Sequence, residues 1–205
     1  MKKTLLSTLA LVALVAFSFA GDKAKDKSAA GPKPGDMAPA FSLTDQNGQT
    51  VTSDQLKGKI VVLEWFNNEC PYVVKFYKGG QMNDWASKYH GKDVVWLAIN
   101  STSGKTVADN KAISSEWKIQ RPILNDAAGE VGKAYGSKNT PTMYIIDKDG
   151  KIAYRGAIDN NSDASPSKID GATNYVAKAL DEMLAGKPVS EPMTKAYGCS
   201  VKYAN

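Results

Sequence analysis

The chain has 205 residues, of which 42% are hydrophobic and 23% charged, with a formal net charge of +5. This length suits one domain with terminal extensions, and the composition is ordinary for a soluble globular protein. The lysines alternate with acidic and polar residues and form no basic run interleaved with aromatic side chains, so the sequence gives no support for nucleic-acid binding.

Residues 1–20 have the layout of a secretory signal peptide. Lys2 and Lys3 form a positive start, residues 5–19 are mostly apolar, and Ser18 and Ala20 are small residues at the −3 and −1 positions of a cleavage site. An uncleaved membrane anchor is the alternative, but the apolar run is shorter than the ~20 residues that a spanning helix needs. We therefore expect an exported protein, periplasmic or extracellular, with no stable membrane insertion after cleavage.

Three further segments follow the signal peptide. Residues 21–36 are rich in Lys, Gly, Pro and Ala, which predicts a flexible linker. Residues 37–186 are predicted to form one domain, and residues 187–205 a C-terminal tail that carries Cys199 outside any regular element. The domain opens with short strands over 41–44 and 49–52, because the Asn47-Gly48 pair between them is a strong hairpin signal.

The middle of the chain predicts two buried strands separated by a helix. Residues 60–66 form a nearly continuous apolar and β-branched run, and residues 93–100 form a second one. Residues 71–89 carry apolar side chains at helical spacing, although Gly79-Gly80 should break this helix midway. Two buried strands joined in this way favour parallel pairing through a right-handed crossover.

The second half of the domain adds helices and a hairpin. Helices are expected over 106–117, 127–135 and 175–184, with strands over 143–147 and 151–156 joined by Lys148-Asp149-Gly150. This order is typical of a mixed α/β fold with a central sheet flanked by helices. The single His90 and the absence of zinc spacing exclude a His-rich or Cys/His metal site.

Cys70 lies where the first buried strand gives way to the first helix. Pro71 suits the first helical position, because its missing N–H would have no partner there. A sulfur at this point faces free backbone N–H groups and the positive end of the helix dipole, which favour the reactive thiolate. The alternatives are an inert buried thiol or one half of a structural disulfide. Lys75, one turn further on, is expected to face water.

Two segments resemble the thioredoxin superfamily. The stretch from Ile60 to Cys70 and on through Pro71-Tyr72-Val73 is similar to its active-site strand and helix, most closely in the redoxin branch. That branch includes alkyl hydroperoxide reductase/thiol-specific antioxidant proteins and exported thiol oxidoreductases. Thr140-Pro141-Thr142 and the strand after it resemble the segment that bears the cis-proline of that fold.

This resemblance covers about residues 41–184 and implies a thioredoxin-like fold with redox activity and no bound cofactor. It implies that Cys70 is the nucleophile, that Pro141 is a cis-proline shaping the site, and that Thr140, Asn67 and Pro71 contact a docked partner. The partner would be a protein dithiol reductant or a disulfide substrate, and a small peroxide is the other substrate class.

The sequence departs from the family patterns at two places. Val73 occupies the second cysteine position of the C-x-x-C motif, so that Cys70 has no local partner. Leu63 and Asn67 stand where the peroxidatic motif P-x-x-x-T-x-x-C has its proline and threonine. The positioning hydroxyl of that motif is therefore missing, although Asn67 can donate a hydrogen bond in its place.

The remaining cysteine, Cys199, allows one internal pairing, with Cys70. In one hypothesis Cys199 resolves a sulfenic acid or mixed disulfide on Cys70, in an exported redoxin-type protein with possible peroxide-reducing activity. In the alternative hypothesis, a structural Cys70–Cys199 disulfide staples a non-catalytic binding or scaffold module. A loop of about 130 residues makes such a disulfide worth about 5 kcal/mol, so stability alone would account for it. A single-thiol disulfide isomerase is a third hypothesis.

Overall fold

The structure is a computed structural model that describes residues 30–204. The predicted signal peptide and linker residues 21–29 lie outside the described residues. Within residues 30–204, no helix combines the length and the hydrophobicity that crossing a membrane requires.

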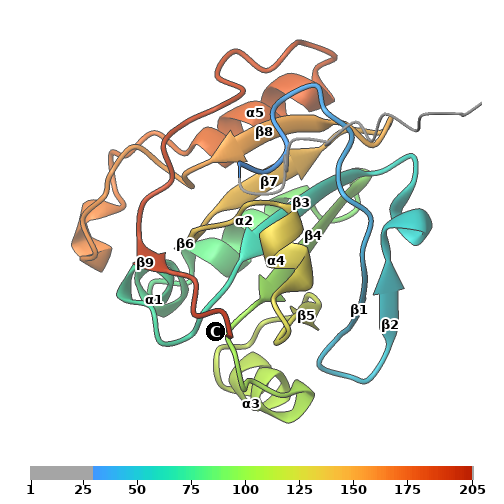
Figure 1. Ribbon diagram of the computed structural model, residues 1–205. Helices are drawn as coiled ribbons and strands as arrows, with labels where there is room; N and C mark the ends of the chain where they lie inside the picture. The colour runs from blue at the N-terminus through green and yellow to red at the C-terminus, as the bar shows by residue number, and fades with distance from the viewer. Residues whose placement is uncertain (1–29, 205) are drawn as a thin grey trace, which may run out of the picture.

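A seven-stranded mixed sheet in the order β2-β1-β5-β4-β3-β7-β8 forms the centre of the molecule (Figure 1). Strands β3 and β4 pair in parallel along their length, from Ile60 opposite Val94 to Trp65 opposite Ile99. Strand β5 is also parallel to β4, whereas β7 is antiparallel to β3 and β8 is antiparallel to β7. The strands are β1 (Ser42–Thr44), β2 (Thr50–Thr52), β3 (Ile60–Trp65), β4 (Val94–Asn100), β5 (Ile123–Asn125), β7 (Met143–Ile146) and β8 (Ile152–Gly156). The predicted α/β thioredoxin-like fold is confirmed.

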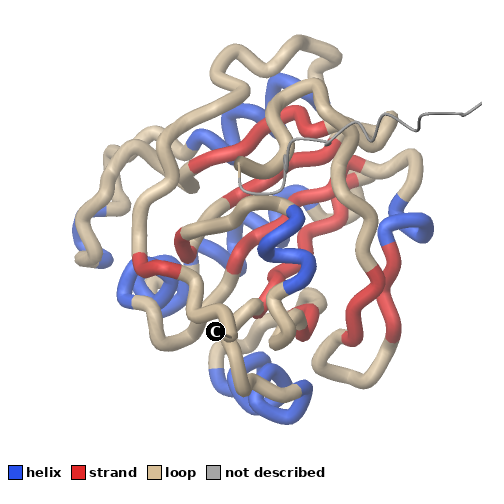
Figure 2. The backbone as a smooth tube through the Cα atoms, in the orientation of Figure 1, coloured by secondary structure: helices blue, strands red, loops and turns tan. Residues whose placement is uncertain are grey.

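Helices cover both faces of the sheet (Figure 2). Alternate residues of β3 point to opposite sides: Val62 packs in the cluster formed with α1, α2 and α5, and Leu63 in the cluster formed with α4 and the β1–β2 hairpin. The predicted break near Gly79-Gly80 is present, because Gly80 has a left-handed φ of 81° and separates α1 from α2. The helices are α1 (Pro71–Lys78), α2 (Gln81–Tyr89), α3 (Val107–Glu116), α4 (Glu130–Ala134) and α5 (Tyr175–Leu184), with 3-10 turns η2 (Ser53–Leu56) and η3 (Pro166–Lys168).

The end of the predicted linker is docked on the domain. The N–H of Gly35 donates to the carbonyl oxygen of Ile152 at 2.8 Å, and the N–H of Ile152 donates to that of Asp36 at 2.9 Å. Arg155 donates to the carbonyl oxygens of Ala30 and Pro32, both at 2.9 Å. The composition of residues 21–36 predicts a flexible segment, whereas residues 30–36 are held on the domain. The linker makes these contacts with its backbone atoms, and composition does not reveal such contacts.

The C-terminal tail crosses the domain and forms a strand that the sequence did not predict. We call residues 192–203 the strap; it leaves the edge of β8, passes α1 and ends near α3 (Figure 1). Within it, β9 (Cys199–Ser200) pairs antiparallel with β6 (Asn139–Thr140), and these two strands form a separate small sheet. The expectation that Cys199 lies outside any regular element is therefore wrong, because its pairing partner is distant in the sequence.

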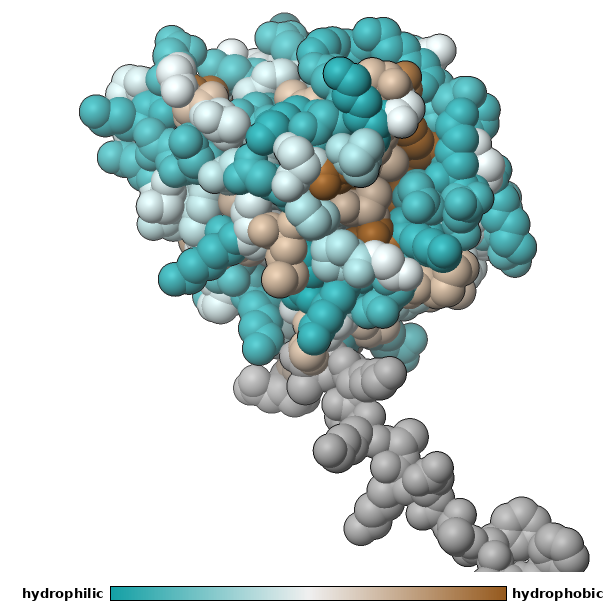
Figure 3. All heavy atoms as spheres, turned by 90° about the horizontal axis from the view of Figure 1, so that it is seen from above, coloured by the Kyte–Doolittle hydropathy of each residue, from teal (hydrophilic) through white to brown (hydrophobic). Residues whose placement is uncertain are grey.

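The surface seen from above is mostly hydrophilic, with small hydrophobic areas between polar side chains (Figure 3). Among the described residues, the exposed large apolar side chains are Met37, Leu184 and Met193. Most of the apolar side chains instead fill the two clusters on either side of the sheet.

Candidate functional site

Cys70 is the N-cap residue of α1, at the end of the loop that leaves β3. Its backbone is extended (φ −87°, ψ 118°), and Pro71 occupies the first helical turn. The N–H of Cys70 donates to the carbonyl oxygen of Asn67 at 3.1 Å, and the side-chain oxygen of Asn67 accepts from the N–H of Glu69 at 2.8 Å. Asn67 is buried and holds this turn, whereas Pro71 is exposed beside it.

The segment around Pro141 lies directly against Cys70. The Thr140–Pro141 peptide bond is cis, as the resemblance implied. The Cys70 thiol donates to the carbonyl oxygen of Thr140 at 3.0 Å, and only 1% of Cys70 is exposed. A reagent of any size must therefore wait for a local opening before it reaches this sulfur.

The strap brings Cys199 to the same place. Cys199 is the residue opposite Thr140 in the β6–β9 pair, the Cys70 thiol donates to the carbonyl oxygen of the same Thr140, and the Cys199 side chain is close enough to Cys70 to lower the pKa of Cys70. Both cysteines are free thiols in the structure, and Cys199 is the more exposed of the two. Two thiols that are 129 positions apart in the sequence thus meet at one site.

The surroundings of the two thiols shift their pKa values in opposite directions. Burial on its own raises the pKa of Cys70, but hydrogen bonds from the side chains of Cys199 and Thr140 and from the N–H groups of Cys199 and Val73 outweigh it. The pKa of Cys70 therefore lies below its ordinary value of 9.0. Burial, followed by the neighbouring Cys70, raises the pKa of Cys199 to about 11. Cys70 is thus the sulfur that is more readily a thiolate and the better leaving group.

The hydroxyl of Thr140 is a further functional group at this site. It is buried and has no hydrogen-bond partner among the groups of residues 30–204. The Thr140 side chain is among the groups that lower the pKa of Cys70, as expected of a hydroxyl that can donate to the thiolate. The sequence placed Thr140 here only by resemblance to the cis-proline segment and did not indicate this role.

Lys75 is buried, which corrects the expectation that it faces water. Its Nζ donates to the carbonyl oxygens of Asn161 and Asp163 at 2.9 and 2.7 Å, and to the Tyr197 hydroxyl at 3.2 Å. The Tyr197 hydroxyl in turn donates to a carboxylate oxygen of Asp159. This network joins the helix of Cys70 to the strap two residues before Cys199. Its partners come from loops far along the chain, so no local pattern could have revealed it.

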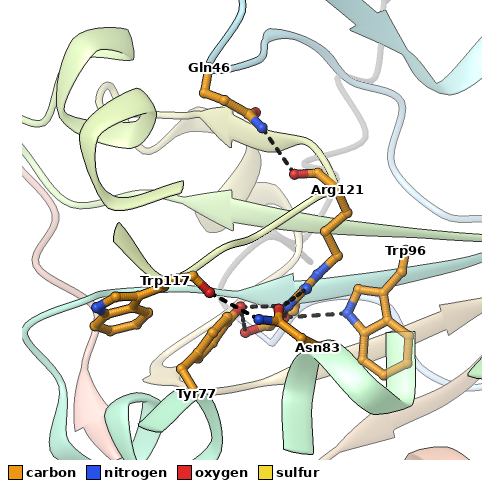
Figure 4. A network of polar contacts seen from close by, with 7 residues as sticks. Gln46, Tyr77, Asn83, Trp96, Trp117 and Arg121 are labelled. Carbon is orange, nitrogen blue, oxygen red and sulfur yellow. Dashed lines mark hydrogen bonds and ion pairs between the residues drawn. The ribbon is translucent and has the colours of Figure 1, made fainter. Parts of the chain in front are cut away.

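A second buried polar network lies on β3 and does not include either thiol (Figure 4). Arg121 pairs with the carboxylate of Glu64 at 2.9 Å, and this carboxylate also accepts from the Tyr77 hydroxyl at 2.7 Å and from the Trp96 indole at 3.3 Å. Asn83 accepts from Arg121 at 3.0 Å. Because Glu64 and Arg121 neutralise each other inside the protein, we assign this network to the fold rather than to chemistry.

The residues described here hold no group of three or more His, Cys, Asp and Glu side chains that could bind a metal ion. A groove of about 810 Å³ lies near the beginning of β3 and β4, lined in part by Lys59, His90 and Trp96. It is at the opposite end of these strands from Cys70, and no thiol lines it. The two-cysteine centre is therefore the best candidate site.

The fold and this site together define a class: thioredoxin-fold proteins with a cysteine at the start of the first helix beside a cis-proline. The AhpC/TSA family model matches residues 34–155. The chain belongs to the AhpC/TSA family, which confirms the resemblance to the redoxin branch.

Individual relatives and structures agree with this membership. The chain is 31% identical over 118 residues to thiol-disulfide oxidoreductase ResA of Bacillus thuringiensis subsp. konkukian, a match covering 58% of this chain and 66% of that protein. It is 30% identical over 156 residues to chloroplastic peroxiredoxin Q of Triticum aestivum, covering 71% and 67%. A structure of an uncharacterised conserved protein from Geobacillus kaustophilus matches with a TM-score of 0.75 and 32% identity, covering 83% of this chain and 92% of that one. A hypothetical protein from Sinorhizobium meliloti 1021 also matches with a TM-score of 0.75, at 27% identity, covering 84% and 95%.

Proposed function

We propose that the protein is an exported thiol-disulfide oxidoreductase in which Cys70 is the nucleophile and Cys199 the resolving thiol. The observation that supports this proposal is the contact between two free thiols whose pKa values are displaced in opposite directions. The likeness to thiol-disulfide oxidoreductase ResA agrees with it. No bound cofactor is needed, because the two sulfurs hold the electrons that are exchanged.

The reaction with a protein disulfide has two steps. The Cys70 thiolate attacks one sulfur of the substrate, and the other substrate sulfur leaves as a thiolate that takes up a proton. Cys199 then loses its proton and attacks the Cys70 sulfur of the mixed disulfide, which releases the second substrate thiol. The substrate gains two electrons, and the protein is left with a Cys70–Cys199 disulfide that a dithiol protein reduces.

A small peroxide is the second candidate substrate, favoured by the AhpC/TSA membership and by the likeness to peroxiredoxin Q. Here the Cys70 thiolate attacks a peroxide oxygen, the O–O bond breaks, and the leaving oxygen takes a proton to form an alcohol or water. Cys199 then attacks the sulfenic acid and displaces water, giving the same disulfide. Asn67 stands at the position of the motif threonine, so that the Thr140 hydroxyl near Cys70 is the hydroxyl that would donate to the peroxide.

Matched assays separate these candidates. We expect the reduced protein to reduce insulin disulfides, or to consume hydrogen peroxide with a recycling dithiol, and Cys70→Ser to abolish either activity. Mass spectrometry after one turnover should show a loss of two hydrogens and a Cys70–Cys199 linkage. A protein that forms this disulfide in air but turns over neither substrate would support the scaffold hypothesis instead.

The export part of the proposal depends on residues 1–20 and is tested independently. We expect the mature protein in the exported fraction to begin at Gly21, as determined by N-terminal sequencing. A Leu14→Arg variant, which places a charge in the apolar run, should keep its full mass and stay inside the cell. Export of this variant, or an unprocessed N-terminus in the wild type, would contradict the proposal.

A further inference from the structure

Lys75 carries a buried charge that neither step of the proposed reaction uses. Only 1% of Lys75 is exposed, and burying an ammonium group is costly unless its N–H groups and its charge are both satisfied. An ammonium has three N–H donors, and three acceptors are present here: the carbonyl oxygens of Asn161 and Asp163 and the Tyr197 hydroxyl. Two of the acceptors thus belong to one loop, and the third belongs to the strap.

Asp159 supplies the counter-charge of this ammonium. It is 2% exposed, and one of its carboxylate oxygens accepts from the Tyr197 hydroxyl. Burial lowers the pKa of Lys75, and the charges of Asp159 and Asp163 oppose this effect. Burial and the hydrogen bond to Asp159 raise the pKa of Tyr197, so that its hydroxyl keeps the proton that it donates. Tyr197 therefore bridges two buried groups of opposite charge, and we call Lys75, Asp159 and Tyr197 the latch.

The latch holds the strap close to Cys199. Gly198 is the one residue between Tyr197 and Cys199, and its φ of 120° is one that other residues avoid. A Cβ atom added to Gly198 would overlap the carbonyl oxygen of Thr140, so the strap passes directly against the cis-proline segment. This close approach leaves little conformational freedom between the two residues. The position of Tyr197 therefore restricts where the Cys199 sulfur can lie.

We propose that Lys75 is a positioning residue for the second step of the reaction, because its ammonium holds the strap so that Cys199 stays within reach of the Cys70 sulfur. This inference rests on the proposed function. Lys75 acts through the Tyr197 hydroxyl and does not touch either sulfur. When the strap moves away, one N–H group of the buried ammonium loses its acceptor, which disfavours the open arrangement. The latch thus returns Cys199 to the mixed disulfide.

A small disulfide separates the two steps in one experiment. The Cys70 thiolate attacks 5,5′-dithiobis(2-nitrobenzoate), forms a mixed disulfide and expels one coloured thiolate. Cys199 then loses its proton, attacks the Cys70 sulfur and expels the second coloured thiolate. The reagent gains two electrons, and the protein is left with a Cys70–Cys199 disulfide. The rate of the first release rises with reagent concentration and that of the second does not, and Cys199→Ser, which can release only one, assigns the second phase.

Lys75→Met nearly keeps the length of the side chain and removes its charge. We expect this variant to slow the second release about tenfold, because a hydrogen bond to a charged group is lost, and to leave the first release no slower than in the wild type. Lys78→Met, at an exposed position on the same helix, is the matched control and should change neither rate. An unchanged second release in Lys75→Met would overturn the inference. Equal slowing of both releases would mean that Lys75 supports the fold in general, which also contradicts it.

Tyr197→Phe tests the same contact by a smaller change, which decides the question even if Lys75→Met folds poorly. It keeps the ring, which packs edge-on against Tyr72 of α1 with 5.9 Å between the ring centres, and removes the bridging hydroxyl. We expect the second release to slow about fivefold. The double variant should be no slower than Lys75→Met alone, because the ammonium acts through this hydroxyl. Additive effects, or an unchanged second release in Tyr197→Phe, would contradict the role of the latch.

The same measurements separate this inference from the proposed function. If the wild type releases one coloured thiolate and no second, Cys199 is not the resolving thiol and both proposals fail. If the wild type releases two and the Lys75 and Tyr197 variants match its rates, the positioning role alone is wrong and the resolving role of Cys199 stands.

Discussion

At the scale of single residues, the acidity of Cys70 depends on a few hydrogen bonds rather than on charge. No lysine or arginine appears among the groups that lower its pKa, and burial opposes them. The donors are the two side chains of Thr140 and Cys199 and two backbone N–H groups. Each donor should therefore have a measurable share in the reactivity of the thiolate.

Replacing Thr140 with valine keeps the shape of the side chain and removes the hydroxyl that donates to the thiolate. We expect the pKa of Cys70 to rise, because a hydrogen bond to its charged form is lost. The measurement is the pH dependence of alkylation of the reduced protein by iodoacetamide, resolved by peptide mass. Thr142→Val is the control, because its hydroxyl donates to Asn139 and not to a thiol. An unchanged midpoint in Thr140→Val would show that the hydroxyl does not serve Cys70.

The two pKa shifts also predict how the stability of the reduced protein varies with pH. The folded pKa of Cys70 lies below 9.0, so between that pKa and pH 9.0 only the unfolded chain keeps the proton, and stability rises with pH. Cys199 stays protonated in the folded protein up to about 11, so its contribution falls as pH rises above its ordinary value of 9.0.

We therefore expect the unfolding free energy of the reduced wild type, relative to a Cys70→Ser/Cys199→Ser double variant, to be greatest near pH 9. Urea denaturation of both proteins under reducing conditions measures this difference. A difference that does not vary with pH would show that the two thiols titrate alike in the folded and unfolded states.

At the scale of elements, a buried ion pair joins β3 to the segment that precedes β5. Arg121 lies in the segment that precedes β5, and Gln46 also bonds to this segment. The Gln46 side chain donates to the carbonyl oxygen of Arg121 at 3.0 Å and accepts from the N–H of Ile123 at 2.7 Å. Glu64 is fully buried in β3. The pair therefore joins β3 to the segment that enters β5, with β4 lying between these two strands in the sheet.

Replacing Arg121 with methionine leaves the Glu64 carboxylate buried without its counter-charge. We expect a loss of about 3–5 kcal/mol in unfolding free energy, measured by urea denaturation. Adding Glu64→Leu should recover a large part of this loss, because the uncompensated charge is then removed. Equal stability of the wild type and Arg121→Met would mean that the pair does not carry this energy. Alkylation of Cys70 should be unaffected in the double variant, since neither residue touches the thiol site.

The elements that sequence could predict are those with long local patterns. The apolar runs of β3 and β4 and the helical stripe of α5 show their structure without help from distant residues. By contrast, β5, β6 and β9 have two or three residues each, and their pairing depends on segments far along the chain. The prediction that Lys75 faces water is wrong for the same reason, because the three oxygen atoms that accept its hydrogen bonds belong to distant segments.

The candidate site also has parts that the sequence could predict and parts that it could not. The position of Cys70 at the start of α1 followed from the strand, the helix and Pro71 between them. The cis-proline segment followed only from family resemblance. The contact of Cys199 with Cys70, the Thr140 hydroxyl and the Tyr197 latch are products of tertiary structure, and no spacing in the sequence encodes them.

At the scale of the whole molecule, the Cys70–Cys199 disulfide would close a loop of about 130 residues around most of the domain. The chain-entropy model gives such a cross-link about 5 kcal/mol of stabilisation. We expect the oxidised protein to need more denaturant for unfolding than the reduced one, and Cys199→Ser to lose its dependence on reductant. Identical transitions of the oxidised and reduced wild type would show that closing the loop leaves stability unchanged.

The outer edge of β8 has a consequence for self-association. This strand ends the sheet, yet Ile152 is bonded to Gly35 and Asp36, and Arg155 to Pro192 and Thr194. Two irregular segments thus occupy the ladder positions that a neighbouring copy would use to extend the sheet from one molecule to the next. A shortened chain lacking residues 30–37 would bare half of that ladder and tend to polymerise edge to edge, even with both cysteines intact.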